Sequence, residues 1–216
     1  MAWVRHDPTT WPRASAYAHY RHMAQPHMAV TVDVDVTAAV AACRAEGRSV
    51  FAGLMHGLVG AVQAVPALRQ RIRFEGGEHV VEHDRVDPAF TVAVAGGRFG
   101  FATVPYVADP VAFSVAVREA SEAQHGIAEL QPFEGVRDDV VYMSCLPWLS
   151  FTSLTHPVHA SREGFVDDVP RIAWGKLTER DGRQLMPVNL QVHHALVDGR
   201  HLGAFFEAVE AGWGAA

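Results

Sequence analysis

The fold is decided near the C-terminus by the stretch Arg183-Gln-Leu-Met-Pro-Val-Asn-Leu-Gln-Val-His-His194-Ala-Leu-Val-Asp198-Gly199. Its first part, residues 185–192, is largely apolar, which is typical of a strand. After Gly199, apolar side chains recur at helical spacing, at Leu202, Phe205, Phe206 and Val209. The two histidines are therefore expected at a strand end, on the turn into a C-terminal helix, where a side chain can be fixed and still accessible.

His193 and His194 are adjacent, and neighbouring strand residues point to opposite faces, so one of the two should be structural. His194 is the candidate general base, because neutral imidazole accepts a proton near pH 7. Asp198 can bond to nearby backbone and Gly199 accepts a positive φ, so both are expected to shape the turn. Two alternatives stay open: Asp198 could orient His194 as in a catalytic triad, or these residues could bind a metal together with His201, although no His-x-x-x-His helix or cysteine cluster supports that.

The rest of the chain alternates between strand and helix patterns. Residues 28–36 place valines on one face and polar residues on the other, which indicates a strand. Thr37 is expected to cap a helix that ends near Gly47, and Asp109-Pro110 to begin another that ends by Gly126. Further strands are predicted at residues 72–74, 79–83, 90–95, 101–106, 139–144, 172–178 and 183–192, with glycine-containing turns at 76–77, 96–97 and 181–182. This order predicts a layered α+β domain with a mixed sheet, and residues 126–137 are the longest predicted loop.

Residues 50–68 form a long apolar stretch in which Gly53 and Gly57 are four apart, as in membrane helix dimers. His56, Gln63 and Pro66 interrupt it, and the neighbouring segments alternate like half-exposed strands. We therefore expect a buried helix packed closely on a sheet rather than a membrane span.

Length and composition agree with a compact cytoplasmic enzyme. The chain has 216 residues, 49% of them hydrophobic, which is enough for a single domain over residues 1–216, although two small domains would also fit. A net charge of −6 argues against a nucleic-acid-binding protein. Cys43 and Cys145 have no metal-type spacing and are expected to be reduced thiols. No apolar signal segment is evident at the N-terminus.

Three segments of the chain together resemble the chloramphenicol acetyltransferase family. They are Trp11-Pro-Arg13 with the later Tyr20, Ser144-Cys-Leu-Pro-Trp148-Leu-Ser-Phe151, and Gln191-Val-His-His-Ala-Leu-Val-Asp-Gly-Arg-His201. The resemblance runs from about Trp11 to the end of the chain. It implies a two-layer sandwich with a mixed sheet covered by helices, a homotrimer with active sites at subunit interfaces, acetyl-CoA as co-substrate, and no metal.

The resemblance also assigns roles in direct acetyl transfer from a thioester to a hydroxyl. His194 removes the hydroxyl proton, and Ser144 donates a hydrogen bond to the oxyanion, with no covalent acyl-enzyme. Asp198 pairs with Arg13 and, with Gly199, holds the turn that presents His194. Without the resemblance, Ser144 would equally fit a serine that caps a backbone group.

Residues with binding roles follow from the same resemblance. Tyr20, Trp148 and Arg171 are the candidates for contact with the acceptor, and Lys176 and Phe151 for contact with acetyl-CoA. Lys176, the only lysine of the chain, would equally fit a solvated strand residue. Departures from the family pattern are Ala173 for a threonine, Arg171 for an apolar residue and Leu177 for an aromatic residue, and they affect the choice of acceptor.

The expected function is therefore an acetyl-CoA-dependent O-acetyltransferase that acts on chloramphenicol and confers antibiotic resistance. Alternatives are a CoA-dependent acyltransferase for a different hydroxylated metabolite, and a non-catalytic homologue that binds an antibiotic. A dihydrolipoyl acyltransferase or a condensation domain would carry the same His-His-x-x-x-Asp-Gly motif. This chain, however, lacks a lipoyl-bearing arm with its Ala/Pro linker and the length of a condensation domain.

Overall fold

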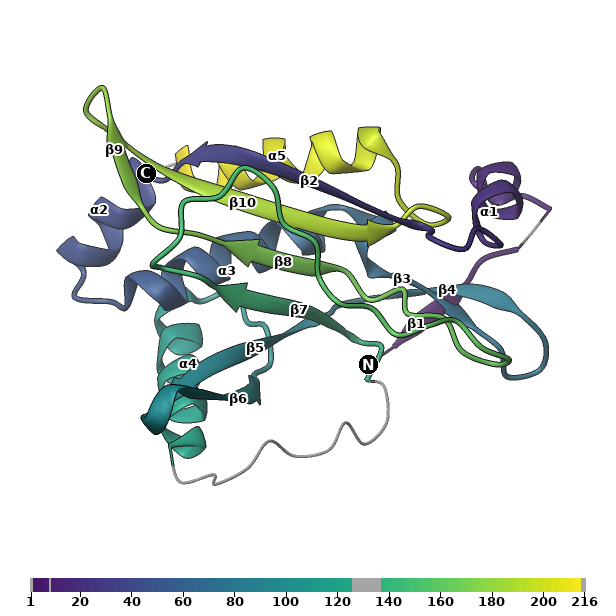
Figure 1. The fold of residues 1–216 in the computed structure, drawn as a ribbon, viewed down its shortest axis with the longest axis horizontal. Coiled ribbons are helices and arrows are strands. Elements are labelled where there is room, and N and C mark those ends of the chain that lie inside the picture. The colour runs from purple at the N-terminus through teal and green to yellow at the C-terminus, as the bar shows by residue number, and fades with distance from the viewer. Residues whose placement is uncertain (1, 8, 126–136, 215–216) are drawn as a thin grey trace.

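A mixed β-sheet forms the centre of the molecule (Figure 1), as seen in a computed structural model that describes residues 2–7, 9–125 and 137–214. The strand order is β2-β10-β8-β7-β5-β6, with β9 paired to β10. These strands are β2 (His27–Asp35), β5 (Asp87–Val94), β6 (Arg98–Thr103), β7 (Val140–Cys145), β8 (Arg171–Trp174), β9 (Thr178–Arg180) and β10 (Arg183–His193). The pairs β5–β7 and β7–β8 are parallel and the others antiparallel, so the predicted mixed sheet is confirmed.

A smaller antiparallel sheet lies beside the large one, in the order β1-β4-β3. Its strands are β1 (Trp3–Arg5), β3 (Gln70–Arg73) and β4 (His79–His83). The predicted hairpin around Gly76-Gly77 joins β3 to β4, and both glycines have the positive φ that such a turn requires.

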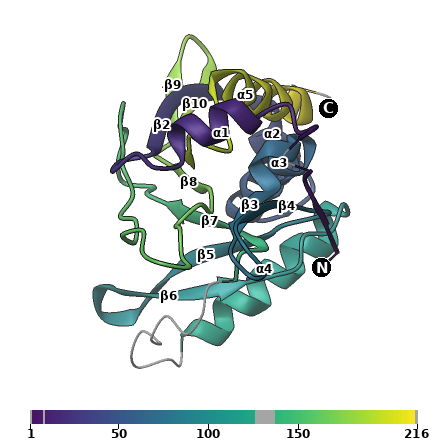
Figure 2. The same ribbon diagram turned by 90° about the vertical axis from the view of Figure 1, so that its right-hand side faces the viewer.

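Helices cover one face of the large sheet, whereas the segment between β7 and β8 covers the other (Figure 2). The helices that cover the first face are α2 (Thr37–Ala45), α3 (Val50–Ala64), α4 (Pro110–Gln124) and α5 (Gly199–Gly214). The short α1 (Ala14–Tyr20) lies near the end of β10 instead. This is the expected two-layer arrangement. The opposite face of the sheet, called the helix-free face below, is covered by residues 146–170, which form no helix (Figure 2).

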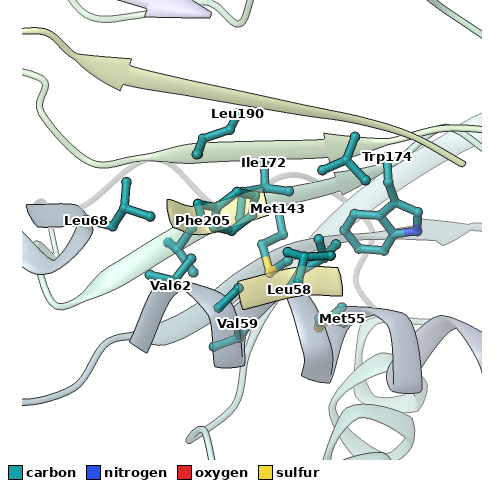
Figure 3. Packing of buried hydrophobic residues seen from close by; sticks show 14 of the residues in the cluster. Met55, Leu58, Val59, Val62, Leu68, Met143, Ile172, Trp174, Leu190 and Phe205 are labelled. Atoms are coloured by element: carbon teal, nitrogen blue, oxygen red, sulfur yellow. The ribbon is translucent and has the colours of Figure 1, made fainter. Parts of the chain in front are cut away.

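The core lies between the helices and the sheet. Leu58 and Val62 of α3 and Phe205 of α5 face strand residues such as Ile172 and Met143 (Figure 3), and all of them are at most 2% exposed. Alternation along β10 sends Met186, Val188, Leu190 and Val192 into this core. The polar residues between them, Asn189, Gln191 and His193, are buried on the helix-free face. The sequence alternation thus separates an apolar layer from a polar one.

Local differences from the predicted elements have physical causes. Thr37 does not cap α2: it is the first helical residue, and its amide and hydroxyl both donate to the Asp35 carboxylate. The single strand expected at 172–178 is two strands, because the chain leaves β8 at Gly175 to bond with Leu149 and Pro187. Asp109 does cap α4, as predicted. The loop predicted at 126–137 lies outside the described residues except for Arg137.

Gly53 and Gly57 serve close packing within the protein. A Cβ atom at Gly57 would lie 2.0 Å from the Trp213 indole nitrogen of α5, and one at Gly53 would lie 2.2 Å from the Cys43 sulfur of α2. Within the described ranges, none of the helices combines the length and apolar character that a membrane crossing needs. The predicted buried helix on the sheet is confirmed, since Leu58 and Val62 of α3 pack against strand residues (Figure 3). The close approaches at Gly53 and Gly57, however, are to the neighbouring helices α2 and α5 and not to the sheet.

Gly57→Ala is expected to lower the free energy of unfolding by about 1–3 kcal/mol, because the added methyl group overfills a packed contact. Chemical denaturation measures the change. The control is Gly203→Ala, where nothing lies within 4 Å of an added Cβ, and where loss of a helical glycine should stabilise by up to about 1 kcal/mol. Equal stabilities for the two variants would contradict the packing described here.

Candidate active site

The turn after β10 fixes His194 through its backbone and its ring. The amide of His194 donates to the Pro26 carbonyl at 2.7 Å, and Nδ1 lies 2.9 Å from the Val197 carbonyl oxygen. A carbonyl only accepts hydrogen bonds, so neutral His194 carries its proton on Nδ1. Its Nε2 then keeps a lone pair and is able to accept a proton.

The neighbouring His193 has a different environment. It is 1% exposed, and its Nδ1 accepts a bond from the Ala195 amide at 3.3 Å. Burial lowers the pKa of His193 to about 4, helped by the nearby His27, so this ring is neutral at neutral pH. The two histidines are thus separated into a buried and a half-buried side chain, as the strand alternation predicts.

Arg13 binds the turn on which His194 lies. Its guanidinium forms an ion pair with Asp198 and donates to the His194 carbonyl at 3.2 Å and the Ala195 carbonyl at 3.5 Å. Burial alone would raise the pKa of Asp198, but the Arg13 bond and the nearby His201 hold that pKa below its usual value. Arg13 therefore holds both ends of the turn through one ionised partner and two carbonyl groups.

Arg13→Ala is expected to destabilise the fold by about 1–3 kcal/mol, between the effects typical of exposed and fully buried ion pairs. The intermediate value is expected because the Asp198 side chain is 36% exposed and the Arg13 side chain 11%. Thermal unfolding measures the change. Arg180→Ala, which removes an exposed pair with Asp33 at 3.9 Å, is the control and should have little effect. An unchanged melting temperature for Arg13→Ala would contradict the role of the pair.

Asp198 also begins the last helix. Its carboxylate accepts a bond from the Arg200 amide at 3.0 Å, as a helix-capping residue does. The direct bond from Asp198 to His194 that a catalytic triad requires is not formed, because His194 Nδ1 bonds to Val197 instead. Gly199 does not have the expected positive φ; it is the first residue of α5. No three or more His, Cys, Asp or Glu side chains among the described residues are arranged to hold a metal ion.

α1 places an aromatic ring directly on the candidate base. The Tyr20 and His194 rings are stacked with their centroids 3.8 Å apart and an interplanar angle of 22°. Such stacking limits the rotation of the imidazole and covers one of its faces. Tyr20 is thus in contact with His194, which brings two of the sequence-predicted site residues together.

Ser144 lies on the helix-free face of the sheet, on β7. Its hydroxyl is 3.5 Å from that of Thr91 on β5, and across β7–β8 it is in register with Ala173. Thr91 was not among the predicted site residues. The alternation of strand 90–95 could have placed it on the face opposite Phe90, but its proximity to Ser144 depends on the parallel pairing of β5 with β7.

A hollow of about 350 Å³ opens at the carboxyl ends of the parallel strands β7 and β8. It is lined by Val50, Phe51, Leu54, Cys145, Pro147, Trp174, Gly175, Lys176, Leu177 and Met186. The predicted residue Lys176 is exposed at its rim, and its amide donates to the Leu149 carbonyl at 2.7 Å. Crevices at the carboxyl ends of parallel strands are common ligand sites.

Two predicted binding residues lie beside this hollow. Phe151 approaches Gly175 so closely that a Cβ atom there would meet its ring at 3.0 Å. Trp148, next to the lining residue Pro147, is 67% exposed, an unusual exposure for so large an apolar side chain. The structure thus gathers Trp148, Phe151 and Lys176 around one opening.

Arg171 is buried, and both terminal nitrogens of its guanidinium donate hydrogen bonds. Its guanidinium bonds to both carboxylate oxygens of Asp167, at 2.6 and 2.8 Å, and to the Val169 carbonyl at 2.9 Å. It also lies 5.3 Å from the centre of the Tyr142 ring. The ion pair of Arg171 with Asp167 therefore makes the helix-free face near Ser144 more polar without adding net charge.

Comparison with known proteins identifies the family. A family model described as chloramphenicol acetyltransferase matches residues 1–210. The chain belongs to the chloramphenicol acetyltransferase family. A chloramphenicol acetyltransferase of Streptomyces acrimycini is 32% identical over 196 residues, covering 90% of this chain and 87% of that protein. Chloramphenicol acetyltransferase 3 of Escherichia coli is 26% identical over 211 residues, covering 97% and 96%.

Solved structures agree with this family membership. A chloramphenicol acetyltransferase structure superposes with a TM-score of 0.81 at 27% identity, covering 97% of this chain and 99% of that one. A dihydrolipoamide acetyltransferase of Azotobacter vinelandii superposes with a TM-score of 0.63 at 15% identity, covering 94% and 86%. The second likeness is one of fold alone. The family resemblance seen in the His-His-x-x-x-Asp-Gly, Ser144 and Trp11 segments is therefore confirmed over nearly the whole chain.

Several residues that line the hollow at the ends of β7 and β8 were not predicted from the sequence. Val50, Phe51 and Leu54 come from α3, and their apolar pattern alone indicated a core helix. They line the hollow because the first turns of α3 lie beside the ends of β7 and β8. No local signal in residues 50–54 could have shown this.

Proposed function

We propose that this protein is an acetyl-CoA-dependent O-acetyltransferase that acetylates a hydroxyl group of chloramphenicol and so confers resistance to it. We further propose that residues 1–216 form one acyltransferase domain. The observation that carries the proposal is the state of His194: its Nδ1 proton is committed to Val197, which leaves Nε2 as a base beside the ring of Tyr20. Family membership supplies the substrates.

The reaction begins when His194 Nε2 accepts the acceptor hydroxyl proton as the hydroxyl oxygen attacks the thioester carbonyl. The carbon becomes tetrahedral and its oxygen negatively charged. Collapse of this intermediate breaks the carbon–sulfur bond, and the protonated imidazole returns its proton to the departing thiolate of CoA. Both substrates are bound together, so no acyl-enzyme is needed.

Ser144 is proposed to donate its hydroxyl proton to the oxyanion. Thr91, whose hydroxyl lies 3.5 Å away, is close enough to orient Ser144. Ala173, in register with Ser144, has no hydroxyl and so offers no second donor at that point of the sheet. A fixed donor of this kind typically contributes about 10²–10³ in rate.

Arg13, Asp198 and Gly199 are proposed to hold the turn that presents His194. The support is the bonding of Arg13 to the carbonyl groups of both His194 and Ala195, in addition to Asp198. Gly199 has no side chain, so the first position of α5 stays open next to the turn. Geometry, rather than proton transfer, is the contribution of these residues.

Acetyl-CoA is proposed to enter through the hollow at the ends of β7 and β8. Apolar lining residues such as Phe51 and Leu54 fit an extended pantetheine chain, and Lys176 at the rim fits a phosphate group. Phe151 and Trp148 would contact the same substrate or line its path. Leu177 in this lining offers less stacking surface to an adenine ring than an aromatic residue would.

A second copy of the chain is proposed to complete each active site. Ser144 on β7 is in register with Ala173 on β8, which is in register with Asn189 on β10. Ser144 is therefore two strands away from Asn189, and His194 lies five residues beyond Asn189 along the chain. With strands about 4.8 Å apart and a rise of about 3.3 Å per residue, the two backbones are separated by roughly 15–20 Å. That separation is too large for one acetyl group to contact both side chains, which supports a site at an interface between two copies. The number of copies in the proposed homotrimer follows from the family resemblance.

The acceptor is proposed to bind on the helix-free face, between Tyr20 of one copy and the face that carries Ser144 in another. Trp148 is exposed enough to contribute to either substrate path, and Arg171 with Asp167 makes the wall more polar than apolar residues would. A related hydroxylated compound is the second candidate acceptor, because Arg171 and Ala173 change both the polarity and the space beside Ser144. The two free thiols, Cys43 and Cys145, support a location in the cytoplasm.

A turnover assay tests the proposal. Purified protein is mixed with acetyl-CoA and chloramphenicol, and free CoA thiol and O-acetylated product are measured together. The expected result is thiol release in equal amount to acetylated chloramphenicol. No release above the rate without acceptor would overturn chloramphenicol as the substrate. Release only with another alcohol of a test panel would favour the second candidate.

A further inference from the structure

The short helix α1 is attached to two other parts of the fold by polar contacts. The helix has seven residues and buries none of them, and isolated helices of this length are not stable in water. Yet α1 carries Tyr20, the ring stacked on His194. Whatever fixes the position of α1 therefore also fixes the surroundings of the proposed base.

The first end of α1 is held by Arg13, which precedes the helix and binds the turn of His194. The middle of α1 and the residue that follows the helix are held from a different part of the fold. Tyr17 donates its phenolic proton to Glu78, and Arg21, which follows the helix, pairs with both oxygens of the same carboxylate. Glu78 lies between β3 and β4, on the hairpin of the small sheet.

The contacts at Glu78 are partly buried. The Glu78 side chain is 18% exposed and that of Arg21 is 27% exposed. Burial raises the pKa of Tyr17 to about 12, so its hydroxyl stays protonated and remains a donor at neutral pH. The Arg21 guanidinium also lies 5.4 Å from the centre of the Tyr17 ring. One carboxylate thus binds Tyr17 in the middle of α1 and Arg21 directly after it.

We propose that Glu78 is a positioning residue for His194: by binding Tyr17 and Arg21, it holds α1 so that Tyr20 stays stacked on the imidazole. The inference rests on the proposed function of His194 as the base. It assigns a role in the active site to a residue on the hairpin of the small sheet, which is far along the chain from the His194 motif. Glu78 acts through α1 and does not touch the reacting atoms.

Removal of the carboxylate should release the middle and the end of α1 while Arg13 still holds its start. Small displacements of groups that orient a reacting residue reduce rates by up to about 10²-fold. We expect Glu78→Gln, which keeps the volume but loses the charge, to lower kcat about tenfold or more. The KM for acetyl-CoA should stay unchanged, because Glu78 does not line the hollow that carries Lys176.

The control is Glu75→Gln, an exposed carboxylate on the same hairpin, which should leave kcat unchanged. A double-mutant cycle then tests the route of the effect. In a Tyr20→Leu background, Glu78→Gln should cause no further loss of kcat. A full additional loss, or a Glu78→Gln variant with kcat within twofold of the parent, would overturn the proposal.

An NMR measurement separates this proposal from the proposed function. Stacking under the Tyr20 ring shifts the imidazole proton signal of His194 upfield, and the signal is identified by its loss in His194→Gln. Glu78→Gln should move the signal toward the unstacked position, and Glu75→Gln should not. An unchanged signal in Glu78→Gln would overturn the positioning role even if the protein proved to have another activity.

Discussion

His194→Ala is expected to lower kcat about 10²–10⁴-fold, the usual contribution of a positioned general base. The physical reason is the loss of Nε2, whose lone pair is kept free by the bond from Nδ1 to the Val197 carbonyl. His194 lies on a turn held by Arg13, outside the apolar core, so the fold should persist. Steady-state kinetics with saturating acetyl-CoA and chloramphenicol give the measurement.

The matched control is His125→Ala, which removes an exposed imidazole at the end of α4 and should leave kcat unchanged. Circular dichroism and thermal unfolding of both variants show that any loss is not a loss of folded protein. His194→Ala with near-parental kcat would remove this residue from the role of base.

Ser144→Ala is expected to lower kcat about 10²–10³-fold, because the oxyanion loses its hydrogen-bond donor. The KM values should change little, since the hydroxyl is used in the transition state rather than in substrate binding. The companion variant Thr91→Val should have a smaller effect in the same direction, because Thr91 contacts Ser144 and not the oxyanion in the proposed arrangement.

Ser121→Ala is the control for loss of a serine hydroxyl. Ser121 lies on α4, where its hydroxyl donates to the Val117 carbonyl of the same helix at 2.7 Å, so kcat should not change. A Ser144→Ala variant that loses substrate affinity at unchanged kcat would contradict the oxyanion role. It would instead make Ser144 a binding residue for the acceptor.

The sequence predicted the elements that depend on local chemistry. The alternation of valines in residues 28–36 predicted β2, and Asp109 was predicted as the cap of α4; both are confirmed. The order of strands could not be predicted in this way, because it depends on long-range pairing. The break between β8 and β9 shows the same limit, since Gly175 and Lys176 bond to residues outside their own segment.

The candidate site divides along similar lines. His194, Asp198, Arg13 and Ser144 could be named from short motifs and their family resemblance. The bond of His194 to Val197 rather than Asp198, the proximity of Thr91 to Ser144, and the contacts of Glu78 with α1 could not. The bond from His194 to Val197 depends on the exact conformation of one turn, which the motif alone does not specify. The other two contacts join segments that are more than 50 residues apart, and no local pattern in either segment indicates its partner.

The central claim is that His194 of one chain and Ser144 of another form one active site. The most direct test refolds the two impaired variants, His194→Ala and Ser144→Ala, together in equal amounts, so that their chains mix in the proposed trimer. In a closed ring of three chains, random mixing pairs an intact His194 with an intact Ser144 at about one quarter of the interfaces. We predict recovery of about a quarter of the parental kcat per site. Activity that stays at the level of the separate variants would contradict the claim.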